Sequence, residues 1–83
     1  MKLYKSPRAV DIVLMVGEAE ESSITGVSKA VGTTYSHTVK IVRMLEAEGL
    51  ATLVKTDRRV MVKLTLKGSE VYHYLKAIKL VIG

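Results

Sequence analysis

The sequence predicts a single α+β domain that has a three-helix core, a two-stranded β-hairpin and a C-terminal helix. Its 83 residues suit one domain, and a composition of 48% hydrophobic and 25% charged residues is typical of a globular chain. Apolar residues recur at helical spacing on both sides of residues 50–65, where apolar and polar residues alternate as in β-strands. We therefore expect residues 1–83 to fold as one unit, with helices before and after the hairpin.

The first helix is marked by its N-terminal residues. Ser6 followed by Pro7 is typical of an N-cap and a first helical position, and the apolar spacing that follows predicts a helix to about Glu18. The acidic segment after it, residues 17–23, is expected to form a solvated turn that faces away from any polyanion.

A helix-turn-helix is predicted next. Thr25 is expected to cap a short second helix that ends at Gly32, a residue suited to the left-handed conformation at a helix C-terminus. Thr34 is expected to cap a third helix, which Gly49 closes. Two short helices joined by a tight glycine turn are typical of this motif. The residues expected to form the buried face of the third helix are Thr38, Ile41, Val42 and Leu45.

The hairpin and a last helix complete the chain. Residues 50–55 and 60–65 alternate with period two, and "KTDRR" between them allows only a short turn. Thr65 is expected to cap a helix over residues 66–83. The order of helix, helix-turn-helix, hairpin and helix is that of a winged-helix domain, which is the fold we expect.

Short motifs strengthen this prediction. Leu-Glu-x-x-Gly-Leu, Asp-x-Arg and Leu-Thr-x-x-Gly signatures mark the MarR-type winged-helix transcription regulators, and the chain resembles them in three segments: "LEAEGL" at 45–50, "DRR" at 57–59 and "LTLKG" at 64–68. The resemblance implies that residues 34–48 form the recognition helix, that the hairpin is the wing, and that Asp57 orients Arg59 for a minor-groove contact. The ligand pocket of the family is built from additional helices and is not carried over.

The charge of the chain predicts an anionic partner. Lys and Arg number 13 against 8 Asp and Glu, which gives a formal charge of +5 and a pI of about 9.6. The outer face of the predicted recognition helix is basic, and free N–H groups at a helix start favour phosphate. An arginine on a hairpin tip suits the narrow minor groove. The residues expected to contact DNA are Thr34, Tyr35, Ser36, Val39, Lys40, Arg43, Asp57, Arg58 and Arg59.

Two plainer interpretations of these charges stay open. The helix residues can form an ordinary solvated face. The wing residues can form a turn whose exposed ion pair contributes only about 0 to 1 kcal/mol.

The absence of Asn and Gln from the sequence has two consequences. These residues are the usual bidentate readers of adenine, so Arg43 and Lys40 are expected to donate to guanine and Val39 to pack on a thymine methyl group. Asn, Gln and Cys are also the thermolabile residues, and the absence of all three predicts a thermophilic source.

The last helix is apolar on more than one face. One face is expected to cover the first helix and a second to pair with a symmetry mate, as in most soluble homo-oligomers. Ordinary core packing is the alternative, and a membrane-surface role is disfavoured because Lys76 and Lys79 alone do not make a basic amphipathic face. The residues expected at a homodimer interface are Tyr74, Leu75, Ile78, Val81 and Ile82.

Several kinds of protein and site are excluded or disfavoured. The chain has no Cys, which excludes disulfides and thiolate chemistry. His37 and His73 share no metal-ligand spacing with a carboxylate, and His37 is expected to be partly buried or to contact the backbone. No phosphate loop or nucleophile with a base is apparent, so no enzymatic activity, catalytic residue, metal or cofactor is expected. Without a signal-peptide pattern or an apolar run of roughly 18 residues, a cytoplasmic protein with no membrane segment is expected.

The sequence therefore predicts a homodimeric, sequence-specific regulator of transcription that binds double-stranded DNA. Residues 34–48 are expected in the major groove, and the wing, residues 55–60, at the minor groove. The alternative is a winged-helix protein-interaction module in a transcription or replication assembly.

Overall fold

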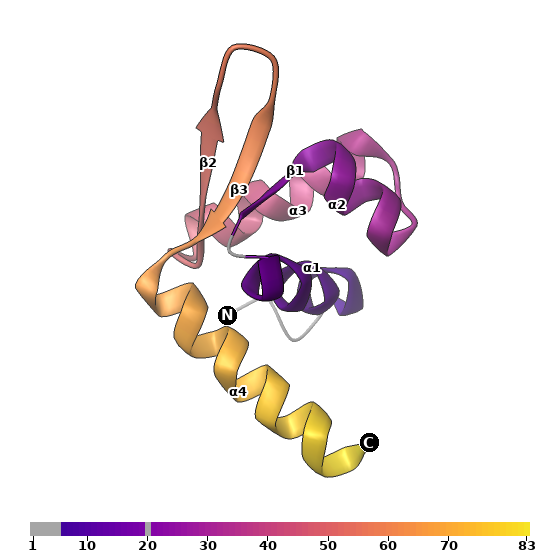
Figure 1. Ribbon diagram of the computed structural model, residues 1–83, viewed down its shortest axis with the longest axis vertical. Coiled ribbons are helices and arrows are strands. Elements are labelled where there is room, and N and C mark those ends of the chain that lie inside the picture. The colour runs from indigo at the N-terminus through magenta and orange to yellow at the C-terminus, as the bar shows by residue number, and fades with distance from the viewer. Residues whose placement is uncertain (1–5, 20) are drawn as a thin grey trace.

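The computed structural model describes residues 6–19 and 21–83, and these form the predicted α+β arrangement of helices around a small sheet (Figure 1). The expectation about a signal-peptide pattern rests in part on residues 1–5, which lie outside the described part. The elements in chain order are α1 (Pro7–Ala19), β1 (Glu21–Ser23), α2 (Ile24–Val31), α3 (Tyr35–Ala47), β2 (Ala51–Lys55), β3 (Val60–Leu64) and α4 (Leu66–Ile82).

The sheet has three strands in the order β1-β3-β2, and both pairings are antiparallel. The predicted hairpin is confirmed as β2 and β3, with Leu53 opposite Val62. The prediction of a solvated turn is wrong for residues 21–23, because they pair with the other edge of β3 and place Ser22 opposite Val62. This pairing satisfies backbone groups that β3 would otherwise expose along an edge.

Hydroxyl side chains cap the N-termini of the helices. The Oγ atoms of Thr34 and Thr65 accept hydrogen bonds from the backbone N–H groups of His37 and Gly68, as their predicted capping roles require. The prediction for Thr25 is wrong, because Ser23 has the extended backbone of an N-cap and accepts from the N–H of Gly26 at 3.0 Å. The helix therefore begins earlier and leaves Thr25 exposed in its first turn.

The turn between α2 and α3 depends on a left-handed residue. Gly32 ends α2 with φ 71°, a conformation that costs glycine little. Arg8 of α1 donates a hydrogen bond to the carbonyl of Val31, one of the last carbonyls of α2. The turn that sets α3 against α2 is thus held by α1 as well as by its own backbone.

The core lies between α1, α2, α3 and the sheet. The predicted buried face of α3 is confirmed, and α1 also contributes several fully buried side chains. The buried apolar residues are Ala9, Ile12, Val13, Val16, Ile24, Val27, Ile41, Val42, Leu45, Leu50, Ala51, Val62 and Tyr72.

The start of α4 is attached where two of the MarR-like motifs meet. Thr65 of "LTLKG" donates through its Oγ1 to the carbonyl of Gly49 in "LEAEGL" at 2.6 Å, and its N–H donates to the carbonyl of Leu50 at 3.0 Å. Gly68 packs so closely on Leu50 that a Cβ would collide with its carbonyl oxygen, and the Tyr72 ring covers Gly17 in the same way. These two signatures therefore join α4 to the core.

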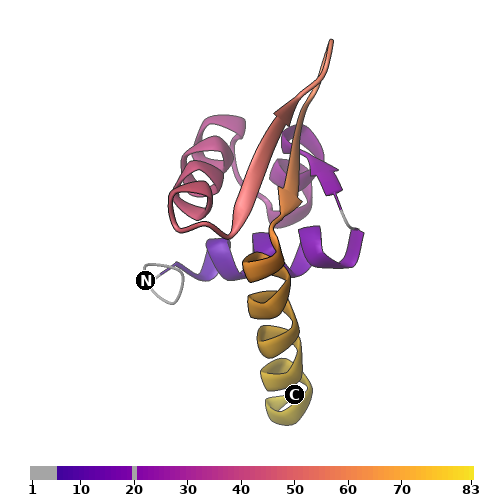
Figure 2. The same cartoon turned by 90° about the vertical axis from the view of Figure 1, so that its left-hand side faces the viewer.

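Beyond Lys76, the exposed end of α4 projects from the body of the protein. Figures 1 and 2 show the hairpin of β2 and β3 projecting from one end and α4 from the opposite end. The molecule is consequently elongated, with extents of 40 × 25 × 22 Å.

Candidate nucleic-acid interface

The outer face of α3 carries the side chains predicted to read DNA. Ser36, Lys40 and Arg43 are exposed, whereas Val39 is half-buried against the core. Tyr35, in the first turn of the helix, is 48% exposed. The predicted division of α3 into a buried and a basic face is therefore present, with Val39 at the boundary.

The tip of the wing is the loop between β2 and β3. Thr56 closes it, because its backbone N–H and its Oγ1 both donate to the carbonyl of Arg59, at 2.8 and 3.2 Å. Asp57, Arg58 and Arg59 are all exposed. Among the described residues Asp57 makes no ion pair with Arg59, and the orienting role of Asp57 in a DNA contact stays a prediction.

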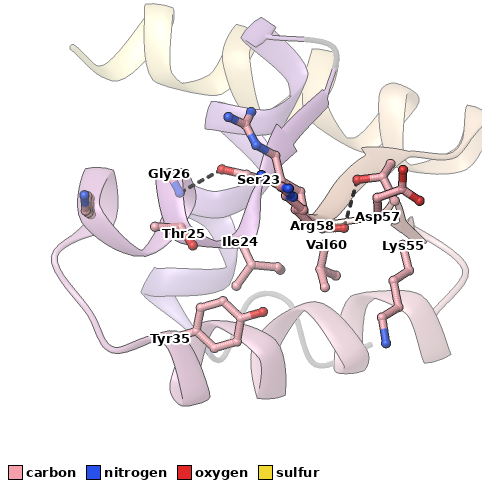
Figure 3. Close-up of a pocket in the computed structure, with 12 residues that line it drawn as sticks. Ser23, Ile24, Thr25, Gly26, Tyr35, Lys55, Asp57, Arg58 and Val60 are labelled. Carbon is pink, nitrogen blue, oxygen red and sulfur yellow. Dashed lines mark hydrogen bonds between the residues drawn. The ribbon is translucent and has the colours of Figure 1, made fainter.

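A cleft of about 610 Å³ separates the wing from the N-terminal ends of α2 and α3. In Figure 3 the Tyr35 ring lies beside Ile24 on its floor, and Lys55 extends from the wing toward α3. The residues that line it are Ser23, Ile24, Thr25, Gly26, Lys29, Tyr35, Lys55, Thr56, Asp57, Arg58, Arg59 and Val60.

The charge around this cleft is strongly positive. Lys29, Lys55, Arg58 and Arg59 line it, against the single carboxylate of Asp57. Cations that surround a concave surface attract a polyanion and concentrate it there. The arrangement suits a nucleic acid much better than an acidic metal site or a hydrolytic centre.

Of the lining residues, Tyr35, Asp57, Arg58 and Arg59 were predicted to contact DNA and others belong to the predicted wing, residues 55–60, but those of β1 and α2 were not predicted. Thr25 was expected to be a cap, and nothing in the sequence indicates that Lys29 and Lys55 face the same cleft. Lys55 begins the charged segment "KTDRR", and this place in the predicted wing is the one feature of the sequence that points to it. Thr25 and Lys29 belong to α2, and only the packing of α2 beside the wing brings them in.

His37 lies in the first turn of α3. The side chain of His37 is exposed, so the prediction that it is partly buried is wrong. His37 precedes buried Thr38 by one residue, which turns its side chain away from the core by about 100° of helix rotation. Its backbone contact is the N–H donated to the Thr34 hydroxyl at 3.1 Å. In the described part of the chain, no three His, Asp or Glu side chains are grouped so that they could hold a metal ion.

A second surface, on α4, is apolar. Tyr74, Ile78, Val81 and Ile82 of the predicted interface are exposed, Ile78 by 55% and Val81 by 85%. Leu75 differs, because it is half-buried and packs against the core of its own chain. Among the described helices none is both long and apolar enough to cross a membrane.

One ion pair joins α4 to α1. Lys76 Nζ lies 3.3 Å from Glu18 Oε1 and 3.4 Å from the hydroxyl of Tyr72. Hydrogen bonds from Tyr72 and then Lys76 lower the pKa of Glu18, and hydrogen bonds with Tyr72 and Glu18 raise the pKa of Lys76. The contact lies at the α4 end of the molecule, away from the basic cleft.

No family model and no curated protein sequence matches the chain, whereas its fold resembles many solved structures. The MarR family transcriptional regulator SPO1453 from Silicibacter pomeroyi superposes with a TM-score of 0.82 and 26% identity, over 89% of this chain and 54% of the regulator. FabT from Streptococcus pneumoniae, solved in complex with DNA, gives 0.85 and 22% identity, over 93% of this chain and 56% of FabT.

A homodimeric winged helix-turn-helix DNA-binding domain from Mycobacterium bovis gives a TM-score of 0.77 and 16% identity, over 98% of this chain and 72% of that domain. The chain spans just over half the length of SPO1453 and of FabT. These likenesses show a winged helix-turn-helix that resembles the MarR-type regulators, as the motifs predicted.

Proposed function

We propose that the chain is a transcription regulator that binds double-stranded DNA in a sequence-specific manner, with α3 in a major groove and the wing at the adjacent minor groove. The observation that carries this proposal is the basic cleft between α3 and the wing. One sugar-phosphate strand separates a major groove from the neighbouring minor groove. In the proposed complex that strand runs through the cleft, between the cations on its two sides.

The candidate residues of the cleft and of the outer face of α3 fall into three groups, according to the part of DNA that each group suits. Thr25, at the start of α2, and the neighbouring Lys29 and Lys55 suit phosphate oxygens, which fix register without reading sequence. Lys40 and Arg43 extend from the outer face of α3 and suit guanine in the major groove. Arg58 and Arg59 suit the minor groove.

We also propose that two copies pair through α4 and bind two half-sites. Tyr74, Ile78 and Val81 follow the spacing of four and three residues that lets two helices pack along a seam. Tyr74, Ile78 and Val81 are exposed, and removing such apolar surface from water is favourable by about 25 cal/mol per Å². The homodimeric domain from Mycobacterium bovis supports pairing in this fold.

The salt dependence of binding tests the proposal against a protein-interaction module. Affinity for a duplex should fall steeply with salt, because each neutralised phosphate releases counterions. The protein is titrated with a random-sequence duplex at several salt concentrations. No binding at low salt contradicts the proposal and favours the protein-interaction alternative.

Selection of bound fragments from random duplexes tests the sequence specificity. One enriched palindromic motif with a guanine in each half-site supports specific binding by a symmetric dimer. Binding without enrichment contradicts specific regulation and favours an architectural role.

A further inference from the structure

Two buried hydroxyl groups link α2 to α3. Ser28 and Thr38 are 6% and 0% exposed in an otherwise apolar core. Ser28 Oγ lies 2.8 Å from Thr38 Oγ1 and 2.8 Å from the carbonyl oxygen of Ile24. Thr38 Oγ1 donates to the carbonyl of Thr34 at 2.9 Å. The contact between the two hydroxyl groups therefore joins α2 to α3, and each hydroxyl also lies within hydrogen-bond distance of a carbonyl of its own helix.

The two hydroxyl protons can make two of these three hydrogen bonds at a time. The proton of Thr38 goes to the Thr34 carbonyl, so the proton of Ser28 is available to Thr38 Oγ1 or to the Ile24 carbonyl. A hydroxyl hydrogen bond requires a defined distance and angle, whereas the hydrophobic attraction between apolar side chains has no preferred direction. The link is therefore a stricter constraint on the crossing of α2 and α3 than the apolar contacts around it.

The two backbone carbonyls in this hydrogen-bonded group belong to residues at the N-terminal ends of α2 and α3, the ends proposed to face DNA. Ile24 is the first residue of α2 and lines the cleft, and Thr34 is the N-cap of α3. The residues after them, Thr25 and Tyr35, also line the cleft. A change in the crossing of α2 and α3 would thus displace the side chains that meet DNA.

We infer that the Ser28–Thr38 hydroxyl pair fixes the angle of the recognition helix and, through that angle, determines how well the protein discriminates between base sequences. The second part of this inference rests on the DNA binding proposed above. Both are positioning residues, since their buried hydroxyls touch no base. Stability alone does not explain them, because replacing two bonded partners by apolar groups of the same shape can be nearly neutral.

Two variants of Thr38 distinguish the effect of its hydroxyl group on the helix angle from the effect of its methyl group on core packing. Thr38→Val keeps the volume and removes the hydroxyl, while Ser28 keeps its bond to the Ile24 carbonyl. Thr38→Ser keeps the hydroxyl and removes a methyl group from the core. We expect Thr38→Val to remain stable but to lose discrimination between the selected and a random duplex by about tenfold, the scale of one mismatched base pair. We expect Thr38→Ser to melt at a lower temperature and to retain its discrimination.

Residual dipolar couplings of the backbone amides, measured without DNA, report the angle between α2 and α3 directly. They should change in Thr38→Val and in Ser28→Ala/Thr38→Val, and stay as in the unmodified protein in Thr38→Ser. The inference would be overturned if both variants that carry Thr38→Val kept the couplings and the discrimination of the unmodified protein. It would also be overturned if the loss of discrimination among the variants followed the loss of melting temperature. If the unmodified protein binds no duplex, the proposed function fails, while the couplings still decide whether the pair fixes the angle.

Discussion

The wing and the C-terminal half of α4 both project from the core, in opposite directions, and they differ in chemistry. The wing tip exposes the charged side chains of residues 57–59, whereas α4 exposes Tyr74, Ile78, Val81 and Ile82. A charged projection is well solvated alone and attracts opposite charge, while an apolar projection gains by leaving water. This difference in chemistry agrees with the two partners proposed above, DNA for the wing and a second copy of the chain for α4.

The two projections are also anchored differently. The base of the wing is held by β3, which pairs with β1 on one side and β2 on the other. The base of α4 is held by close backbone packing at Gly68 and by the Tyr72 ring. Substitutions toward either free end should consequently alter binding while the core stays folded, which makes the comparison testable.

Ile78→Glu should have the largest effect, at the apolar end. A carboxylate in the proposed seam would be desolvated without a partner, so the variant should sediment as a folded monomer. Binding to a duplex with two half-sites about 34 Å apart should weaken about 100-fold or more, because the linkage of two recognition helices is lost.

His73→Glu is the matched control, because it places the same charge on an exposed position of α4 outside the seam. It should leave the dimer intact. An unmodified protein that sediments as a 9.1 kDa monomer at micromolar concentration would show that α4 is not a pairing surface.

Arg59→Ala should have the largest effect at the charged end. Loss of the proposed minor-groove contact should weaken duplex binding by about 1 to 3 kcal/mol and leave the melting temperature unchanged. Lys63→Ala is the control, because it removes one positive charge from β3, away from the wing tip and beside residues of α4. Equal affinities of the two variants at fixed salt would mean that only net charge matters. Asp57→Ala should act more mildly.

Arg43→Ala should change the sequence preference more than the affinity. If Arg43 donates to guanine, its loss should reduce discrimination at one base position by about tenfold. If Lys40 contacts a phosphate and not the guanine, Lys40→Ala should weaken all sequences alike and lower the slope of affinity against salt by about one. Selection from random duplexes compares the two variants, and an unaltered motif with Arg43→Ala would remove this residue from base reading.

Glu18→Gln should have the smallest effect, because the ion pair with Lys76 is exposed. The pKa of Glu18 is lowered, so its contribution to stability is present above the ordinary pKa of 4.5 and is lost as the pH falls through the lower folded value. The pKa of Lys76 is raised, so its contribution is present below 10.5 and is lost at higher pH.

The melting temperature of Glu18→Gln should therefore be slightly lower than that of the unmodified protein at neutral pH. In strong acid the two melting temperatures should be equal. Glu46→Gln, at another exposed acid, is the control. A difference that persists in strong acid would assign the effect to packing and not to charge.

Much of the local structure was predictable because neighbouring residues determine it. Caps at Ser6, Thr34 and Thr65 satisfy N–H groups three residues away, and the left-handed turn at Gly32 needs only its own backbone. The missed elements depend on distant partners. Residues 21–23 form a strand because β3 offers an edge about 40 positions later in the chain, and this early strand makes Ser23 the cap in place of Thr25.

The sequence by itself determined the order of the four helices and the hairpin, the buried face of α3 and the charge of the wing, since periodicity and residue type are local properties. The thermophilic source stays a prediction from composition, which the fold does not test. Tertiary structure alone decided that Lys29 and Lys55 share a cleft with the wing arginines, that Leu75 packs inward, and that Ser28 meets Thr38. These facts depend on the crossing angles of whole elements, and such angles arise only when the complete core packs.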